Sequence, residues 1–117
     1  MNILLKKLTL NTILIGLLLV SFASATVADK ADGKKIAFDR KKGNCLACHV
    51  MGDGDMAGNV GPPLIAMKIR FPDRAILKAQ IWDATAKNPI SIMPPFGKHY
   101  VLTDDEIESL LDYLYTL

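Results

Sequence analysis

The stretch Cys45-Leu46-Ala47-Cys48-His49 decides how this chain of 117 residues folds, because it holds both cysteines and one of the two histidines. Two cysteines three positions apart are too close in sequence for the long loop that a structural disulfide usually closes. A thioredoxin-like dithiol would follow a strand in a βαβ unit, and the flanking sequence provides no such setting. A tetrahedral zinc site would need further Cys or His ligands, and only His99 remains. These three uses of the cysteines are therefore disfavoured.

The spacing C-x-x-C-H is the attachment pattern for c-type haem. One turn of chain presents both thiols to one edge of a porphyrin and directs the next residue, His49, to the iron. We therefore predict one haem c with iron, bonded covalently to Cys45 and Cys48 and ligated by His49. Because both thiols become thioethers, any reaction that needs a nucleophilic cysteine must take it from a partner.

The second axial ligand must reach the iron from the face opposite His49. Met93 is the best candidate, because it lies far along the chain in the proline-stiffened segment Met93-Pro94-Pro95-Phe96-Gly97, which can wrap that face. A methionine ligand favours ferrous iron. His99 and an open sixth position remain as alternatives. The methionines closer to His49 are expected to fill gaps in the core: Met51, Met56 and Met67.

The other ring nitrogen of His49 needs an acceptor that fixes the tautomer of the ring. Gly61-Pro62-Pro63-Leu64 supplies a rigid turn after the glycine-rich residues 52–63. We take the carbonyl of Pro62 as the candidate acceptor, and a purely structural turn is the alternative.

The remaining sequence is helical in pattern, with long loops. Thr103 and Glu106 form a capping box, and an apolar stripe of helical period follows: Ile107, Leu110, Leu111 and Leu114. A second helix is predicted from just after Asp73 to about Ala84, with Ile76, Leu77 and Ile81 toward its buried side. A third is predicted over residues 33–42, with Asp32 as its N-cap. No strand-like alternation of useful length occurs, so the fold class is all-α, with three or more helices.

Residues 1–25 read as a signal peptide. Lys6 and Lys7 precede an apolar run, and Ala23-Ser24-Ala25 is the small-x-small pattern that a signal peptidase recognises. Cleavage after about Ala25 leaves one domain of residues 26–117, exported to the periplasm and without a membrane span. An uncleaved anchor is the alternative, although the apolar run is short for a span of about 20 residues.

Charge disfavours a nucleic-acid partner. The fourteen Lys and Arg side chains face twelve Asp and Glu, and two of the basic ones lie in the leader, so the remainder carries equal numbers of both signs. Basic residues between Lys34 and Lys42 and acidic residues of the last helix form either a solvated surface or a dipole that orients docking. Trp82 is expected in the core, and Phe96 in an exposed apolar patch.

Five motifs together resemble the SoxX family, the monohaem cytochrome c subunits of sulfur-oxidising complexes, over residues 33–117. The C-x-x-C-H motif alone indicates only a c-type cytochrome. The segment from Asn88 to Gly97 is what distinguishes this family from other c-type cytochromes. The motifs are Gly43-Asn44-Cys45-Leu46-Ala47-Cys48-His49, Gly61-Pro62-Pro63-Leu64, Asn88-Pro89 to Met93-Pro94-Pro95-Phe96-Gly97, Leu102-Thr103-Asp104-Asp105-Glu106-Ile107 and Tyr113-Leu114-Tyr115.

The resemblance implies a class I cytochrome c fold with His49 and Met93 as axial ligands. It also implies a SoxA-type cytochrome partner, with one or two haems, and a SoxYZ-type carrier reached through the complex. In that family the complex joins thiosulfate to a carrier cysteine, as an L-cysteine S-thiosulfotransferase. The SoxX subunit relays electrons to a downstream cytochrome and is not itself a catalyst. A free-standing electron carrier and a haem protein with an open sixth site are the alternatives.

Overall fold

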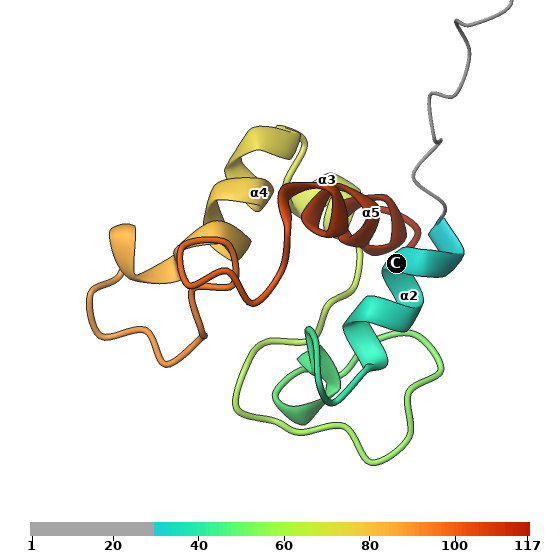
Figure 1. The fold of residues 1–117 in the computed structure, drawn as a ribbon. Coiled ribbons are helices and arrows are strands. Elements are labelled where there is room, and N and C mark those ends of the chain that lie inside the picture. The colour runs from blue at the N-terminus through green and yellow to red at the C-terminus, as the bar shows by residue number, and fades with distance from the viewer. Residues whose placement is uncertain (1–29) are drawn as a thin grey trace, which may run out of the picture.

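The computed structural model describes residues 30–117, so the predicted signal peptide of residues 1–25 lies outside the described residues. Figure 1 shows helices joined by long loops, and no described helix is long and apolar enough to cross a bilayer. Within residues 30–117, backbone pairing of the β type is limited to one bridge between Met51 and Leu64. The all-α prediction is confirmed. The elements are α2 (Lys30–Phe38), η1 (Cys45–Ala47), α3 (Met67–Arg70), α4 (Arg74–Trp82), η2 (Ala84–Ala86) and α5 (Asp104–Leu114).

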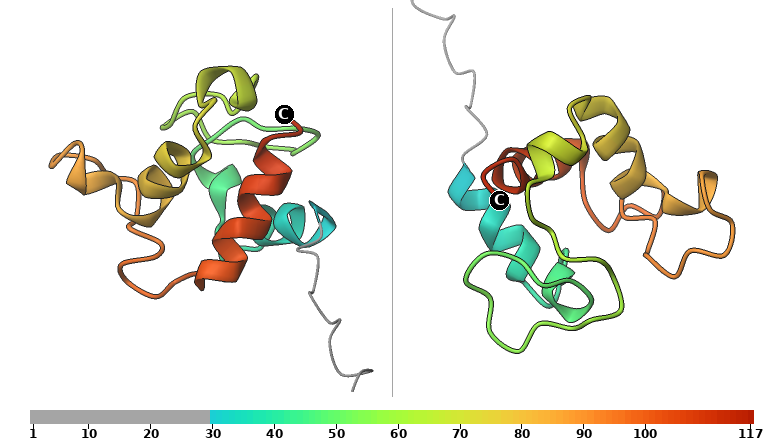
Figure 2. Two further views of the ribbon diagram at one scale, coloured as in Figure 1. Left: turned by 90° about the horizontal axis from the view of Figure 1, so that it is seen from above. Right: turned by 180° about the vertical axis from the view of Figure 1, so that it is seen from behind.

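The first and last described helices, α2 and α5, cross in contact (Figures 1 and 2). Gly33 permits this approach, because a Cβ atom there would lie 2.0 Å from the backbone oxygen of Ser109 and 2.8 Å from the Cβ of Tyr113. Phe38 meets the Tyr113 ring edge-on, with 6.3 Å between ring centroids. The crossing brings the two ends of the domain together and fixes the start of the loop that carries the cysteines.

Helix α5 is the centre of the core, as its sequence predicts. The Thr103 hydroxyl accepts from the Glu106 amide at 3.2 Å, and the Glu106 carboxylate accepts from the Thr103 amide at 2.9 Å, which completes the capping box. The predicted apolar stripe is buried: Ile107, Leu110, Leu111 and Leu114.

Helix α4 begins where the sequence predicts and ends slightly earlier. The Asp73 carboxylate accepts from the Ala75 amide at 2.8 Å and so caps the helix. Leu77 and Ile81, four residues apart, are buried, whereas Ile76 is 52% exposed. The expectation that Ile76 is buried was wrong, because α4 contacts α5 along a narrower stripe than the sequence suggests.

Helix α2 departs from the predicted span of residues 33–42. It already includes Lys30 and ends at Phe38. Asp39 then starts a turn: its backbone oxygen accepts from the amides of Lys42 and Asn44, each at 3.0 Å, and its carboxylate accepts from the Lys41 amide at 2.8 Å. This local hydrogen bonding competes with the helix and ends it four residues early.

The acidic side chains of α5 are used within the molecule. Glu108 lies 2.8 Å from Arg74 and 2.7 Å from Lys78, and the Glu108 carboxyl has a lowered pKa because these two cations hydrogen bond to it. Further pairs tie α5 to its surroundings: Arg74 with Asp112, Lys78 with Asp104, and Lys42 with Glu106. These contacts favour a structural role for the acidic face over a docking dipole.

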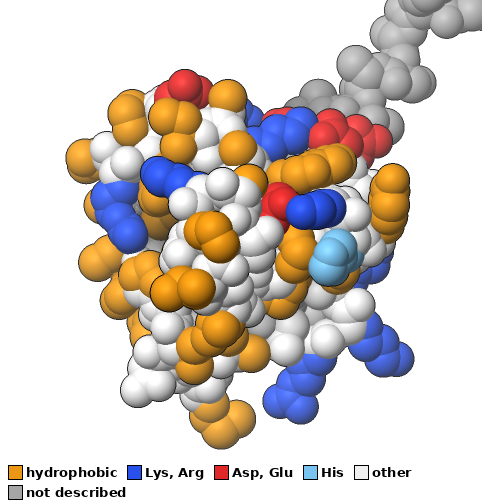
Figure 3. All heavy atoms as spheres, turned by 90° about the vertical axis from the view of Figure 1, so that its left-hand side faces the viewer, with side chains coloured by type: hydrophobic (Ala, Val, Ile, Leu, Met, Phe, Trp, Pro, Cys, Tyr) orange, Lys and Arg blue, Asp and Glu red, His pale blue; other side chains and the backbone are white. Residues whose placement is uncertain are grey.

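Three side chains lie where the sequence did not predict them. Phe96 is only 7% exposed, Trp82 is 39% exposed, and Met56, expected in the core, is 92% exposed. The view in Figure 3 shows apolar side chains dispersed over the face that α4 and the segment after it present. Phe96 packs in the hydrophobic core and also lines the cavity described below.

Candidate functional site

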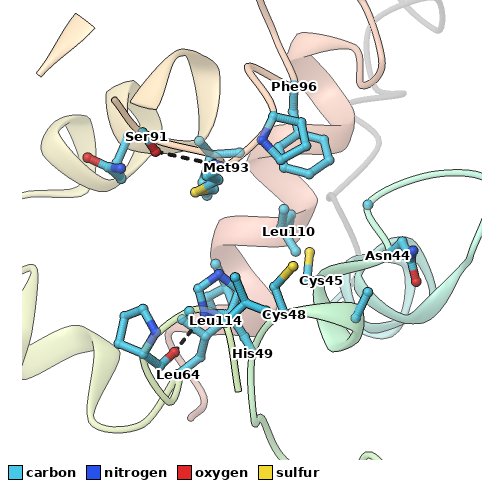
Figure 4. A pocket seen from close by; sticks show the side chains of 18 of the residues that line it. Asn44, Cys45, Cys48, His49, Leu64, Ser91, Met93, Phe96, Leu110 and Leu114 are labelled. Carbon is cyan, nitrogen blue, oxygen red and sulfur yellow. Dashed lines mark hydrogen bonds between the residues drawn. The ribbon is translucent and has the colours of Figure 1, made fainter. Parts of the chain in front are cut away.

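A cavity of about 810 Å³ lies between the η1 turn, α4, α5 and the loop around Met93. Its volume falls within the range of about 300–1,000 Å³ typical of small-molecule and cofactor sites. All five site residues predicted from the sequence line it: Cys45, Cys48, His49, Pro62 and Met93. All of these except Pro62 are labelled in Figure 4.

The η1 turn presents the two cysteines. Asn44 precedes it in the left-handed conformation (φ 44°), which asparagine tolerates better than most residues. The Cys45 carbonyl accepts from the amides of Cys48 at 3.1 Å and His49 at 2.9 Å, which winds the motif into one tight turn. Both sulfurs point into the cavity beside His49 (Figure 4).

The two thiols are unbridged, and Cys45 is poorly suited to act as a thiolate. Burial raises the pKa of the Cys45 thiol to about 11, so the thiol is protonated at neutral pH. Reactive dithiols instead have lowered pKa values. The site therefore gives no support to a redox dithiol.

His49 is held in one tautomer by the Pro62 carbonyl. The Nδ1 atom lies 2.7 Å from the Pro62 oxygen, which can only accept a hydrogen bond, so Nδ1 carries the proton in a neutral ring. The lone pair then resides on Nε2, the atom by which imidazole binds a metal. The hydrogen bond expected at Pro62 is thus present.

The segment from Gly58 to Leu64 runs back along the cysteine motif. Amides of this segment donate to the motif or to residues next to it at 2.8–2.9 Å: Gly58 to Leu46, Gly61 to Cys48, and Leu64 to Val50. A Cβ atom on Gly61 would lie only 2.2 Å from the Cε1 of His49. The glycine backbone therefore packs directly on the imidazole and limits how the ring can turn.

Met93 approaches from the opposite wall of the cavity (Figure 4). Its amide donates to the Ser91 hydroxyl at 3.3 Å. Beyond it, the Phe96 carbonyl accepts from the amides of Val101 and Leu102, and the Trp82 carbonyl accepts from the amides of Gly97 and Lys98. The loop is thus fastened to the end of α4 on its far side.

The other candidate ligands are less well placed. The His99 side chain is exposed, and His99 does not line the cavity. Met51 is buried outside the cavity wall, and Met56 is exposed. Met67 does line the cavity, but its sulfur lies 3.7 Å from the Nη1 of Arg70, beside the turn that contacts His49. Met93 is therefore the methionine that faces His49.

The cavity wall fits a haem. Most of it is apolar, as the flat macrocycle requires, and among the described residues no Asp or Glu lines it. Three cationic side chains do so: Arg40, Lys42 and Arg70. Haem carries two carboxylates, and a cavity with basic but no acidic side chains suits them.

Several supporting residues could not be assigned from the sequence alone. Ser91 lies two residues before Met93, a spacing that allows a hydroxyl-to-amide turn. Leu110 and Leu114 belong to the predicted stripe of α5, but periodicity does not indicate that they face a cavity. Arg70 lies on a helix of four residues that has no periodic signal.

Comparison with known proteins agrees with this geometry. Residues 28–114 match the family described as cytochrome C oxidase, cbb3-type, subunit III. A protein of Aquifex aeolicus (strain VF5), described as an uncharacterized lipoprotein, is 38% identical over 77 residues, which cover 64% of this chain. The matched region spans 37% of that relative, so most of the relative has no counterpart in the alignment.

The family match covers the cysteine motif, the Pro62 turn, the Met93 loop and all of α5. The chain therefore belongs to the family of cytochrome c oxidase, cbb3-type, subunit III, and it is an electron-transfer haem protein of the c type whose haem is bound covalently and contains iron.

Proposed function

We propose that this chain is a periplasmic electron carrier in thiosulfate oxidation, the SoxX-like subunit of an L-cysteine S-thiosulfotransferase complex. The observation that carries the electron-transfer part is the placement of His49 and Met93 on opposite walls of one cavity, with both thiols beside His49. In this proposal Cys45 and Cys48 hold the haem, and His49 and Met93 ligate its iron, which takes up and releases one electron.

If His49 and Met93 both bound the iron, no position on it would remain for a substrate. His49 is fixed by Pro62, and Met93 is held by a loop fastened to α4, so neither ligand needs to move when the charge of the iron changes. Such rigidity keeps the reorganisation that accompanies electron transfer small. In a haem protein with an open sixth site, the cavity wall opposite His49 would not supply a ligand to the iron.

The thiosulfate part rests on the resemblance over residues 33–117 and on the use of both cysteines. Joining thiosulfate to a cysteine thiol forms one sulfur–sulfur bond and releases one proton and two electrons. Cys45 and Cys48 are assigned to the haem, so the reacting cysteine belongs to a SoxYZ-type carrier. A SoxA-type cytochrome then carries the reaction centre, and this chain passes the electrons one at a time to a downstream cytochrome.

The predicted leader and a relative described as a lipoprotein support a location outside the cytoplasm. Cleavage after about Ala25 and release into the periplasm is the proposal for this chain.

The test is co-expression of the haem-loaded chain with a SoxA-type cytochrome. We expect the two to purify as one complex, and the haem of this chain to become reduced only when thiosulfate and a SoxYZ-type carrier are both added. The family description suggests a second candidate, a subunit that passes electrons to a terminal oxidase. Purification with such an oxidase, or reduction by many donors without any stable partner, would contradict the thiosulfate assignment.

A further inference from the structure

Arg70, the last residue of α3, contacts the turn that carries the Pro62 carbonyl. Its Nη1 atom donates to the Pro63 oxygen at 2.8 Å and to the Ile65 oxygen at 3.3 Å. A single cationic group therefore joins α3 to two carbonyls of the segment that follows Pro62. Its guanidinium carbon also lies 5.9 Å from the centre of the Phe71 ring, which limits its freedom.

The turn has few other supports. Proline has no amide hydrogen, so neither Pro62 nor Pro63 can donate a backbone hydrogen bond. The amides of Gly61 and Leu64 donate hydrogen bonds to Cys48 and Val50, but the two prolines between them form hydrogen bonds only through their carbonyls. The donors for those carbonyls are His49 at Pro62 and Arg70 at Pro63.

We propose that Arg70 is a positioning residue: by holding the Pro63 and Ile65 carbonyls it keeps the Pro62 carbonyl against His49 Nδ1 and thereby tunes the iron. This inference rests on the proposed role of His49 as an axial ligand. A strong hydrogen bond from Nδ1 increases the basicity of the imidazole. A more basic ligand stabilises ferric iron, so loosening the turn raises the reduction potential.

Arg70 also lines the cavity, and its charge alone would act in the opposite sense. A positive charge near the iron disfavours the ferric state, so removing it lowers the potential. Arg40 provides the matched control, because it is another exposed arginine at the cavity wall that makes no hydrogen bond to residues 62–65. Comparing the two positions separates the effect of charge from that of the contact with the turn.

The experiment measures the solvent exchange rate of the His49 Nδ1 proton by NMR in the ferrous haem-loaded protein, together with the reduction potential. Arg70→Met should accelerate this exchange about tenfold, the factor that corresponds to one net hydrogen bond. Arg40→Met should leave it unchanged. Arg70→Lys, which retains a donor, should lie between Arg70→Met and the unmodified protein. Because Arg70→Lys keeps the charge and weakens the contact with the turn, its potential should lie above that of the unmodified protein.

Equal exchange rates in Arg70→Met and Arg40→Met would overturn the proposal and leave Arg70 with a purely electrostatic effect. If Arg70→Met fails to fold with haem, Arg70→Gln takes its place. Gln has no charge, and its side chain is too short to make both hydrogen bonds of Arg70, so its exchange rate is compared with that of Arg40→Gln. Failure of the proposed function is recognised separately: if His49 is not a ligand, the unmodified protein itself lacks a His49 signal shifted by the haem.

Discussion

The position of one proton on His49 determines what the site can bind. The Pro62 carbonyl accepts a hydrogen bond from the Nδ1–H group of His49. In the neutral ring Nε2 therefore carries no proton and can bind iron directly. Gly61 holds the ring from one side, with no room for a larger residue. The ligand is thus preorganised by two neighbouring backbone positions.

Replacing Gly61 with alanine should therefore damage the site more than an average alanine substitution. The added Cβ would overlap the imidazole, 2.2 Å from Cε1, and either the ring or the turn must shift. We expect the haem-loaded protein to lose about 1–3 kcal/mol of stability, as is usual for overpacking. Denaturant unfolding followed by haem absorption measures the loss.

Gly54→Ala is the matched control for this experiment. Its Cβ would lie 2.3 Å from the Cδ1 of Leu46, the far end of a flexible side chain that can move aside. We expect a clearly smaller loss. Equal losses for the two variants would mean that contact with the His49 ring is not what makes Gly61 important.

Helices α4 and α5 both line the cavity, and the loop that carries Met93 is fastened to α4. Helix α5 provides the buried stripe and ion pairs with α4, and the end of α4 holds the loop of Met93. Their stability therefore bears directly on both walls of the cavity.

The capping box should contribute measurably to α5. Thr103→Ala removes the hydroxyl that accepts from the Glu106 amide, and the loss of such a cap costs about 1 kcal/mol. Thr103→Ser retains the hydroxyl and should restore most of the stability. Thermal unfolding of the three proteins checks this. A Ser variant as unstable as the Ala variant would point to the lost methyl group instead.

Asp83, directly after α4, should make stability depend on pH in acid. Its carboxylate accepts from the Lys98 ammonium at 2.7 Å and from the Thr85 amide, and the bond to Lys98 is the main reason why the Asp83 pKa is lowered to about 2. A lowered pKa stabilises the fold above the unfolded value of about 3.9, and this contribution is lost as pH falls toward 2.

The variant Asp83→Asn tests this linkage. At pH 7 it should be less stable than the unmodified protein, and the difference should shrink as pH falls from about 4 to about 2, the interval between the unfolded and folded pKa values. Urea unfolding at several pH values measures it. A difference that is constant across this range would show that the Asp83 charge does not contribute.

Sequence patterns predicted α5 with its capping box and the start of α4 well, because periodicity and capping are local signals. The end of α2 was missed because the competing turn at Asp39 is a matter of three specific hydrogen bonds. Phe96 and Trp82 were misplaced because the tertiary packing of the loop after α4, which hydropathy does not indicate, buries Phe96 in the core and leaves Trp82 39% exposed. The sequence could indicate residues that line one cavity because haem attachment requires a fixed cysteine spacing, whereas the contacts of Arg70 depend on tertiary structure.

The molecule as a whole is organised around its cavity. A small domain has a modest core and usually needs a covalent or cofactor staple. Here apolar residues from α4, α5 and the Met93 loop face a space of about 810 Å³. Unless a cofactor fills this space, its apolar side chains stay in contact with water, and the free energy of burying them is not gained.

A variant that cannot attach haem should therefore be poorly folded. In Cys45→Ser with Cys48→Ser we expect much reduced helical content and no cooperative unfolding transition, as judged by circular dichroism. The single variant Cys45→Ser retains one attachment point and should keep more structure. A double variant with full helical content and a sharp transition would show that the haem is not needed for folding.

Near-infrared absorption of the ferric protein shows whether iron is held between His49 and Met93. We expect a low-spin spectrum with the weak band that marks a methionine–iron bond, and we expect Met93→Ala to lose this band while the haem remains covalently attached. If the band survives the substitution, or is missing from the unmodified protein, Met93 is not the ligand.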